Sequence, residues 1–531
     1  MRLKLFLSDM SLPIARAART AVVALALFVP LGADAASDRP APFEPSWNSL
    51  KQYHCPDWFR DAKFGIWAHW SAQCVPEQGD WYASMMYQQG ERRYRFHLEH
   101  YGHPSKVGFK DIDQRWRAER WDPEKLMSLY QRAGAKYFVA LANHHDNFDC
   151  YDSKYQPWNS VNIGPHKDIV GVWAAAARKH GLRFGVSVHA SRAWTWMEPA
   201  QGADTNGPLA GVPYDGKLTK ADGRGTWWEG YDPQDLYAQN HPIGAKPDAA
   251  YIEKFFNRTL DLVDKYRPDL IYFDDVTLPL ARYSNDGLKF AAHFYNASRE
   301  WHQGTNQAVM TTKRLDELQR QCLVWDIERA RSDRLEPLPW QNDTCIGSWH
   351  YDRPRYERHG YKPVKLVLQM LADVVSKNGN LLLSVPLRGD GTIDEDEVKT
   401  LQDLAAWMKV NREAIFGTRP WRVFGEGPPD LQAATVSEHD LRPYTSEDVR
   451  FTTKGSTLFA IGMVWPANGR LTLKTLASGA EPANFGAVKL LGSGKKVKWT
   501  RTATGLELDL PRGQTMQEPF VLRFSTKPAA H

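Results

Sequence analysis

The chain of 531 residues is too long for one ordinary domain, so we expect two. Its apolar content of 42% and charged content of 24% are those of a globular protein. A net charge of +5 is weak over this length, and without a dense Lys/Arg run it argues against a nucleic-acid partner. The 21 tryptophans and 21 tyrosines suit stacking on flat or sugar-ring surfaces, although a large aromatic core would also account for them.

The N-terminus predicts a secretory signal peptide over residues 1–35. Basic residues precede the apolar run 21–32, and the small residues 33–35 follow it, as at a cleavage site. The apolar run is short for a membrane span, so an uncleaved anchor is less favoured. We expect a periplasmic or secreted protein that begins near Ala36 and does not associate with a membrane. Five scattered cysteines permit one disulfide in an oxidising compartment.

Further along the chain, apolar strands alternate with amphipathic helices. Asp122 and Asp168 are expected to cap two of the helices, and Gly134 and Gly181 to end them. The expected strands, with the ionisable residues that end them, are 64–68 with His69, 137–142 with His144 and His145, 184–188 with His189, and 270–273 with Asp274. This pattern predicts a (β/α)8-like, TIM-type barrel over residues 36–418, because such barrels build their sites at strand C-termini. A doubly wound sheet is the alternative, although no glycine-rich loop follows the first strand.

Two other regions differ from this pattern. A Gly/Asp/Pro-rich insertion over residues 199–247 contains Trp227 and Trp228, and we expect such a long loop to cover a binding site. From residue 419 to 531, short alternating runs are split by Gly, Ser and Pro. They predict a C-terminal antiparallel β-sandwich that gathers no catalytic residues.

The strand-end residues admit three interpretations. The residues expected to converge are His69, Asp80, Trp81, His144, His145, His189 and Asp274. A zinc or iron site is the first interpretation, but there is no HExxH helix, and adjacent histidines in a strand point to opposite faces. Hydrogen-bonded interior histidines are the second. Glycoside hydrolysis is the third, with Asp274 as a nucleophile fixed at a strand end and Asp275 as its rival. On this interpretation no metal and no cofactor is needed.

These segments resemble glycoside hydrolase family 29, the α-L-fucosidases. The resemblance extends over most of the mature chain, in segments 58–70, 80–87 with Asp80 in place of the family's Glu, 135–160, 270–275, 374–393 and 411–421. It implies an exo-acting enzyme that removes terminal α-L-fucose from fucosylated oligosaccharides or glycoconjugates with retention. It also implies a covalent fucosyl-enzyme on Asp274, and a fucose held by His69, Trp81, His144 and His145.

The acid/base does not transfer from the family pattern. One branch has a Glu after a Trp where this chain has Trp340-Gln341, and a glutamine cannot supply a proton. Glu328, at the end of a strand-like run, is therefore our predicted acid/base. Glu336 and Asp343 are the alternatives.

Two other functions stay open at the level of sequence. A fucose-binding protein without catalysis is suggested by Asp80 and Gln341, and a barrel glycosidase of another sugar specificity would use similar groups. His189 and the segment 190–196, together with Trp227 and Trp228, are expected to shape the acceptor side of the site.

Overall fold

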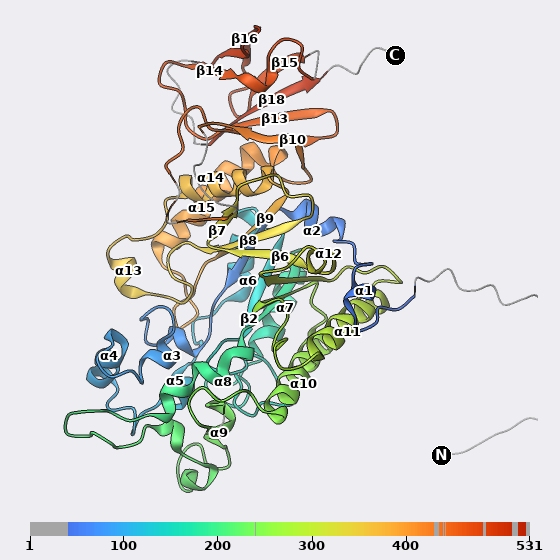
Figure 1. The fold of residues 1–531 in the computed structure, drawn as a ribbon. Coiled ribbons are helices and arrows are strands. Elements are labelled where there is room, and N and C mark those ends of the chain that lie inside the picture. The colour runs from blue at the N-terminus through green and yellow to red at the C-terminus, as the bar shows by residue number, and fades with distance from the viewer. Residues whose placement is uncertain are drawn as a thin grey trace, which may run out of the picture. The chain divides into compact units, whose positions relative to one another are not determined.

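The computed structural model describes residues 41–238, 241–428, 435–438, 440, 442–481, 485–511 and 519–526, so the expected signal peptide lies outside the described residues. Within these ranges eight parallel strands close into a barrel, which confirms the predicted TIM-type fold (Figure 1). In order round the barrel they are β1 (Phe64–Ala68), β2 (Tyr137–Asn143), β3 (Arg183–Val188), β4 (Leu270–Val276), β5 (Val309–Lys313), β6 (Val324–Glu328), β8 (Trp340–Cys345) and β9 (Gly379–Ser384). No helix in the described ranges is long and apolar enough to cross a bilayer.

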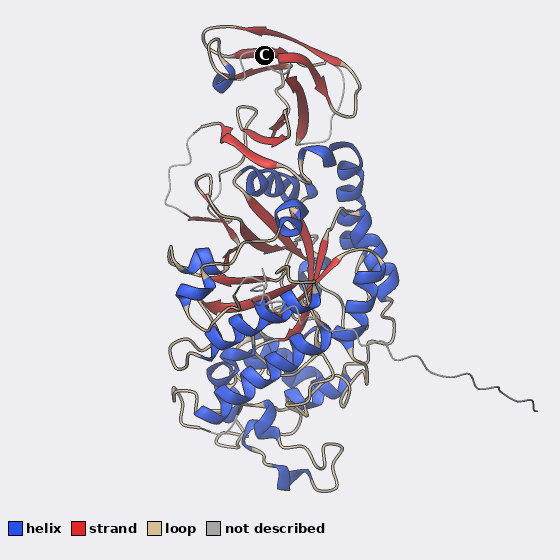
Figure 2. Ribbon diagram, turned by 90° about the vertical axis from the view of Figure 1, so that its right-hand side faces the viewer, coloured by secondary structure: helices blue, strands red, loops and turns tan. Residues whose placement is uncertain are grey.

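Helices lie outside the barrel strands, as Figure 2 shows. The α-helices are α1 (Trp47–Leu50), α2 (Asp57–Ala62), α3 (Tyr82–Met85), α4 (Arg92–His100), α5 (Phe109–Arg115), α6 (Pro123–Arg132), α7 (Ile169–Lys179), α8 (Ala193–Trp196), α9 (Pro233–Leu236), α10 (Ala249–Tyr266), α11 (Asp286–Trp301), α12 (Gln319–Cys322), α13 (Arg353–Glu357), α14 (Val364–Ser376) and α15 (Glu395–Asn411). The short 3-10 helices are η1 (Ala72–Cys74), η2 (Ala190–Arg192), η3 (Glu198–Gln201), η4 (Asp215–Lys217), η5 (Lys220–Gly223), η6 (Arg412–Ala414) and η7 (Lys474–Leu476).

The predicted helix ends are confirmed at α6 and α7. The carboxylates of Asp122 and Asp168 accept hydrogen bonds from backbone N–H groups in the first turns. Gly134 and Gly181 follow the helices with φ of 106° and 69°, a left-handed conformation that glycine adopts without strain. The five cysteines all lie in described ranges and are free, so the disulfide that the sequence permitted does not form.

From Arg419 the chain forms an antiparallel sheet. Its strand order is β10 (Arg419–Glu426), β12 (Val449–Lys454), β13 (Thr457–Gly462), β18 (Phe520–Thr526), β15 (Phe485–Leu490), β16 (Lys496–Arg501), β17 (Leu506–Asp509) and β14 (Arg470–Leu473). Phe451 of β12, near one end of this order, and Leu471 of β14, at the other end, belong to one apolar core. The sheet is therefore curved, so that strands far apart in the order pack against each other. Strand β11 (Thr435–Ser437) pairs instead with β7 (Ala330–Ser332), which follows barrel strand β6.

A buried ion-pair cluster joins α14 to this sheet. Asp373 of α14 accepts from Arg450 Nε of β12 at 2.6 Å and from Lys377 Nζ at 2.8 Å, and Arg331 lies 3.7 Å away. Burial alone would raise the pKa of Asp373, but the three cations outweigh it and hold that pKa below its usual value.

We expect Asp373→Ala to lower the free energy of unfolding by about 3–5 kcal/mol, because it leaves buried cations without a counter-charge. Chemical denaturation at neutral pH measures the change. Since the folded-state pKa is lowered, the stabilisation is present above the unfolded pKa of about 4 and is lost as the pH falls further. Asp403→Ala, which removes an exposed pair with Lys399, is the control, and an equal effect of both variants would contradict the prediction.

Candidate active site

Asp274 lies at the C-terminal end of β4, where the register against β5 shifts. Tyr272 pairs with Thr311 and Val276 pairs with Lys313, so the residues between them on β4 bulge. A bulge re-aims side chains, and bulges are common beside active sites. This local irregularity brings Asp274 into contact with side chains from three other barrel segments.

The Asp274 carboxylate is held by three donors. Its Oδ2 lies 3.2 Å from His145 Nε2 and 3.3 Å from His189 Nδ1, and its Oδ1 lies 2.5 Å from Lys313 Nζ. Burial alone would raise the pKa of Asp274, but the Lys313 ammonium and the two histidine hydrogen bonds outweigh it and hold the pKa well below its usual value. The carboxylate is therefore anionic and fixed, as a nucleophile requires.

Lys313 also contacts the predicted acid/base. Its Nζ lies 2.5 Å from Glu328 Oε2, so one ammonium bridges Glu328 and Asp274. The two carboxylate oxygens can lie no farther apart than twice that distance. This upper bound, which holds for one oxygen of each carboxylate, is compatible with the roughly 5–5.5 Å between the carboxyl groups of retaining glycosidases.

Neutral histidines line the site beside Asp274. Burial lowers the pKa of His189 to about 4, so the neutral ring donates from Nδ1 to Asp274. Its buried Nε2 has no hydrogen-bond partner among the described residues. An unused buried acceptor of this kind is a position for a ligand hydroxyl. Burial also lowers the pKa of His69 and of His144 well below the usual value.

The two adjacent histidines lie on the same side of the barrel mouth. Their rings are 4.4 Å apart, and the His144 ring is 4.8 Å from that of His189. The expectation that His144 and His145 point to opposite faces is wrong, because β2 ends at Asn143, after a bulge against β3. His144 Nδ1 lies 3.0 Å from the side-chain nitrogen of Gln73, which fixes the ring.

Of the other predicted acids, Asp275 and Glu336 have partners away from this centre, whereas Asp343 lies beside Glu328. Asp275 accepts from Ser191 at 2.6 Å, and burial raises its pKa to about 7. Glu336 lies before the start of β8 and is bound by Arg320 at 2.6 Å. Asp343 is buried, pairs with Glu328 across β6 and β8, and accepts from the Tyr272 hydroxyl at 3.1 Å. Burial and the neighbouring Asp326 and Glu328 raise the pKa of Asp343 well above its usual value, although the Lys313 ammonium opposes them. Gln341 is also buried, and its side-chain nitrogen donates to Asp326 at 2.9 Å rather than to Asp274.

Asp80 and Trp81 lie at the edge of the site rather than on Asp274. Asp80 Oδ1 accepts from the backbone N–H of His350 at 2.8 Å. The His350 ring is 4.7 Å from that of His144 and 5.7 Å from that of His69. Asp80 therefore positions a further histidine. Trp81 has a φ of 64° and is 48% exposed.

The insertion tryptophans do not face the site as expected. Trp227 donates from Nε1 to Asp111 at 2.8 Å, and Trp228 is buried against Gly223. The segment 190–196 does reach the site, because the ring of Trp196 lies 5.4 Å from that of His145.

Sequence reasoning missed Lys313, His350, Gln73 and Arg192. Arg192 Nη2 lies 3.9 Å from Asp274 Oδ1. Lys313 ends strand β5, so the rule that selected His69, His189 and Asp274 would have found it once "VMTTK" was recognised as a strand. No comparable signal marks Gln73, which lies in the short helix η1, or His350, which lies in a loop.

A barrel of this type with two carboxylates close together at the C-terminal ends of its strands has the groups that glycoside hydrolysis uses, so the fold and this centre indicate a glycoside hydrolase. Comparisons with known proteins narrow the class. The family profile described as Alpha-L-fucosidase matches residues 31–413, and that of the Alpha-L-fucosidase C-terminal domain matches residues 442–525. The chain belongs to the α-L-fucosidase family, which confirms the resemblance seen in its sequence.

Curated relatives and solved structures also include α-L-fucosidases that match nearly the whole chain. Tissue alpha-L-fucosidase of Rattus norvegicus is 28% identical over 504 residues, which cover 92% of this chain and 93% of that protein. The Homo sapiens enzyme is 28% identical over 512 residues, with 94% of each chain covered. The crystal structure of Thermotoga maritima alpha-fucosidase with a mechanism based inhibitor has a TM-score of 0.69 and 25% identity, and covers 91% of this chain and 100% of its own.

Proposed function

We propose that Asp274 is the nucleophile and Glu328 the acid/base of a retaining exo-α-L-fucosidase. Family membership makes the chain a fucose-releasing glycoside hydrolase. The single observation that supports the two roles is the Lys313 ammonium shared by both carboxylates. Glu328 is 39% exposed in its side chain, so it can exchange protons with solvent, whereas Asp343 is buried and Glu336 is buried and bound by Arg320.

The proposed reaction has two steps. A carboxylate oxygen of Asp274 forms a bond to the anomeric carbon while Glu328 gives a proton to the departing glycosidic oxygen. Glu328 then takes a proton from water, which attacks the same carbon and frees Asp274. Glu328 must carry a proton in the first step, and because Lys313 contacts only its Oε2, the other oxygen is free to carry that proton.

His69, His144, His145 and His189 are proposed to hold the fucose hydroxyls, and Trp81 to cover the sugar at the edge. The nitrogens of His144, His145 and His189 also lie within 4.8 Å of one another, a spacing that a metal ion could use. Asp274 already contacts His145 Nε2 and His189 Nδ1, and Gln73 contacts His144 Nδ1, so these nitrogens are not available to a metal ion. His189 Nε2, which has no partner among the described residues, is open to a sugar hydroxyl.

The test is hydrolysis of an aryl α-L-fucoside by the chain from Ala36 onward, with the first-formed anomer followed by NMR. We expect α-L-fucose first, and no comparable turnover of aryl α-D-galactosides. Initial release of the β anomer would overturn retention. Fucose binding without hydrolysis of any fucoside would instead support the non-catalytic alternative.

We also propose a cleaved signal peptide and a periplasmic or secreted location, which the basic and apolar N-terminal segments support. Mass spectrometry of the protein from its native host should find an N-terminus near Ala36. An intact Met1 in the active protein would contradict this.

Lys313→Met should move the acidic limb of the kcat/KM profile to higher pH by about one unit or more, because the ammonium keeps the pKa of Asp274 low. Removing it raises that pKa, so the nucleophile is protonated at a pH where the wild type is still ionised. Lys313→Arg, which keeps the charge, is the control and should shift the limb less. Superimposable limbs for Lys313→Met and wild type would contradict this role.

A further inference from the structure

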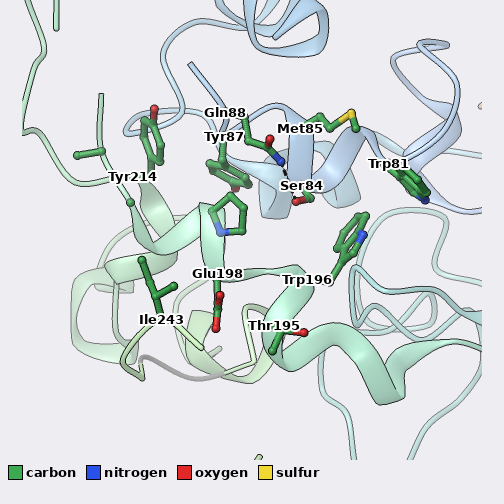
Figure 3. Close-up of a pocket in the computed structure, with 13 residues that line it drawn as sticks. Trp81, Ser84, Met85, Tyr87, Gln88, Thr195, Trp196, Glu198, Tyr214 and Ile243 are labelled. Carbon is green, nitrogen blue, oxygen red and sulfur yellow. Dashed lines mark hydrogen bonds between the residues drawn. The ribbon is translucent and has the colours of Figure 1, made fainter. Parts of the chain in front are cut away.

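Beside the histidines of the site lies a second recess, and Trp81 is the one residue of its lining that has a role above. A pocket of about 510 Å³ opens between α3 and η3, and Figure 3 shows side chains that line it. Its walls include Trp81, Met85, Tyr87, Trp196, Tyr214 and Ile243. The volume falls within the roughly 300–1,000 Å³ typical of small-molecule sites.

The pocket shares a wall with the active site. The Trp196 ring lies 5.4 Å from that of His145 and 6.0 Å from that of His144, while His145 contacts Asp274. Figure 3 shows Trp196 pointing towards Trp81. When a fucoside lies with its anomeric carbon at Asp274, the group linked to the fucose can therefore extend past Trp196 into the pocket.

Its tyrosines offer ring faces rather than hydroxyls. The Tyr87 hydroxyl donates to Asp215 at 2.7 Å, and the Tyr214 hydroxyl donates to Asp204. Because these hydroxyls are already bonded, the rings are fixed and what they offer a ligand is an aromatic surface. Such surfaces pack against the apolar face of a pyranose ring.

The remaining lining is neutral apart from one carboxylate, that of Glu198. Ser84, Gln88 and Thr195 are uncharged donors and acceptors. The Glu198 carboxylate accepts the backbone N–H of Gly244 at 2.6 Å, which satisfies one of its oxygens. The pocket therefore has aromatic faces, a few neutral polar groups and one carboxylate, a combination that suits a neutral sugar and disfavours an acidic one.

We propose that this pocket binds the sugar ring to which fucose is linked, and that it selects a neutral pyranose as the leaving group. The inference rests on the proposed fucosidase function and adds the acceptor class to it. Trp196 then contributes to both sites, and the acceptor site is built from α3 and the segment after β3 rather than from Trp227 and Trp228.

The experiment compares kcat/KM for a neutral fucosylated trisaccharide with kcat/KM for methyl α-L-fucoside, which has no second ring. An aryl fucoside is avoided because its ring could stack in the same pocket. Trp196→Ala and Ile243→Asp should each lower the trisaccharide-to-methyl ratio by about tenfold or more. Ile243 is 84% exposed, so its replacement does not disturb a core. The matched control is Trp227→Ala, on the same insertion but outside the pocket lining, which should keep the wild-type ratio.

Three results would count against the proposal. An unchanged ratio in both pocket variants, with an active wild type, would overturn the acceptor site and leave the fucosidase function standing. A ratio that falls equally in Trp227→Ala would show a general effect of the insertion and would also overturn it. A wild type that cleaves neither substrate would overturn the proposed function and this inference with it.

Discussion

Asp274→Gly should lower kcat/KM on α-L-fucosides by on the order of 10³-fold or more while the fold survives. The carboxylate supplies the covalent bond of the first step, and glycine leaves a space in its place. Azide added to this variant should enter that space and attack the anomeric carbon from the same face, giving β-L-fucosyl azide. Product analysis with an aryl α-L-fucoside measures both effects.

The control for this variant is Asp275→Asn. Asp275 is adjacent in sequence but bonded to Ser191, so its replacement should leave most of the turnover. If the Asp275 variant gave the azide product, the nucleophile would be Asp275. If Asp274→Gly kept near wild-type turnover, Asp274 would not be the nucleophile.

Glu328→Ala should lower kcat/KM by about 10²–10⁴-fold on natural fucosides, whose sugar leaving groups need a proton. The loss should be much smaller on a dinitrophenyl fucoside, whose leaving group departs as a stable anion. Azide should accelerate release of the fucosyl-enzyme and give α-L-fucosyl azide, because attack on that intermediate restores the original configuration. Kinetics across leaving groups of different acidity measure the effect.

Asp343→Asn is the matched comparison for Glu328, since the two residues are paired across β6 and β8. We expect Asp343→Asn to lower activity to the same extent on both kinds of leaving group, because its carboxylate accepts a hydrogen bond from Tyr272 and so helps to position that side chain. A leaving-group dependence confined to Asp343→Asn would assign the acid/base to that residue instead.

Much of the barrel could be predicted from local signals. The caps at Asp122 and Asp168 and the stops at Gly134 and Gly181 depend on neighbouring residues only, and the structure confirms them. Strand β18 was missed, although it pairs with β13 and β15 in the centre of the C-terminal sheet. Its short apolar run near the chain end has no helical or turn signal of its own.

The candidate site shows the limit of such reasoning. Strand-end positions predicted that His69, His189 and Asp274 converge, because parallel strands share one C-terminal edge. The bridging contact of Lys313 could not be predicted, since it depends on the register of β5 against β4 and β6. The bulges in β2 and β4 likewise determine the directions of the His144 and Asp274 side chains. The alternation of apolar and polar residues in the sequence does not reveal where a bulge occurs.

The packing of the C-terminal sheet on the barrel limits how freely these parts can be exchanged. Phe459, Ile461 and Met463 of the sheet belong to the same apolar cluster as the barrel core, and Trp407 of α15 donates to the backbone of Pro519 at 2.7 Å. A chain cut after residue 418 would expose that apolar surface, and the buried carboxylate of Asp373 would lose its partner Arg450. The enzyme is therefore a poor source of a minimal catalytic fragment, and a graft of its barrel onto another carrier would have to bring the sheet along.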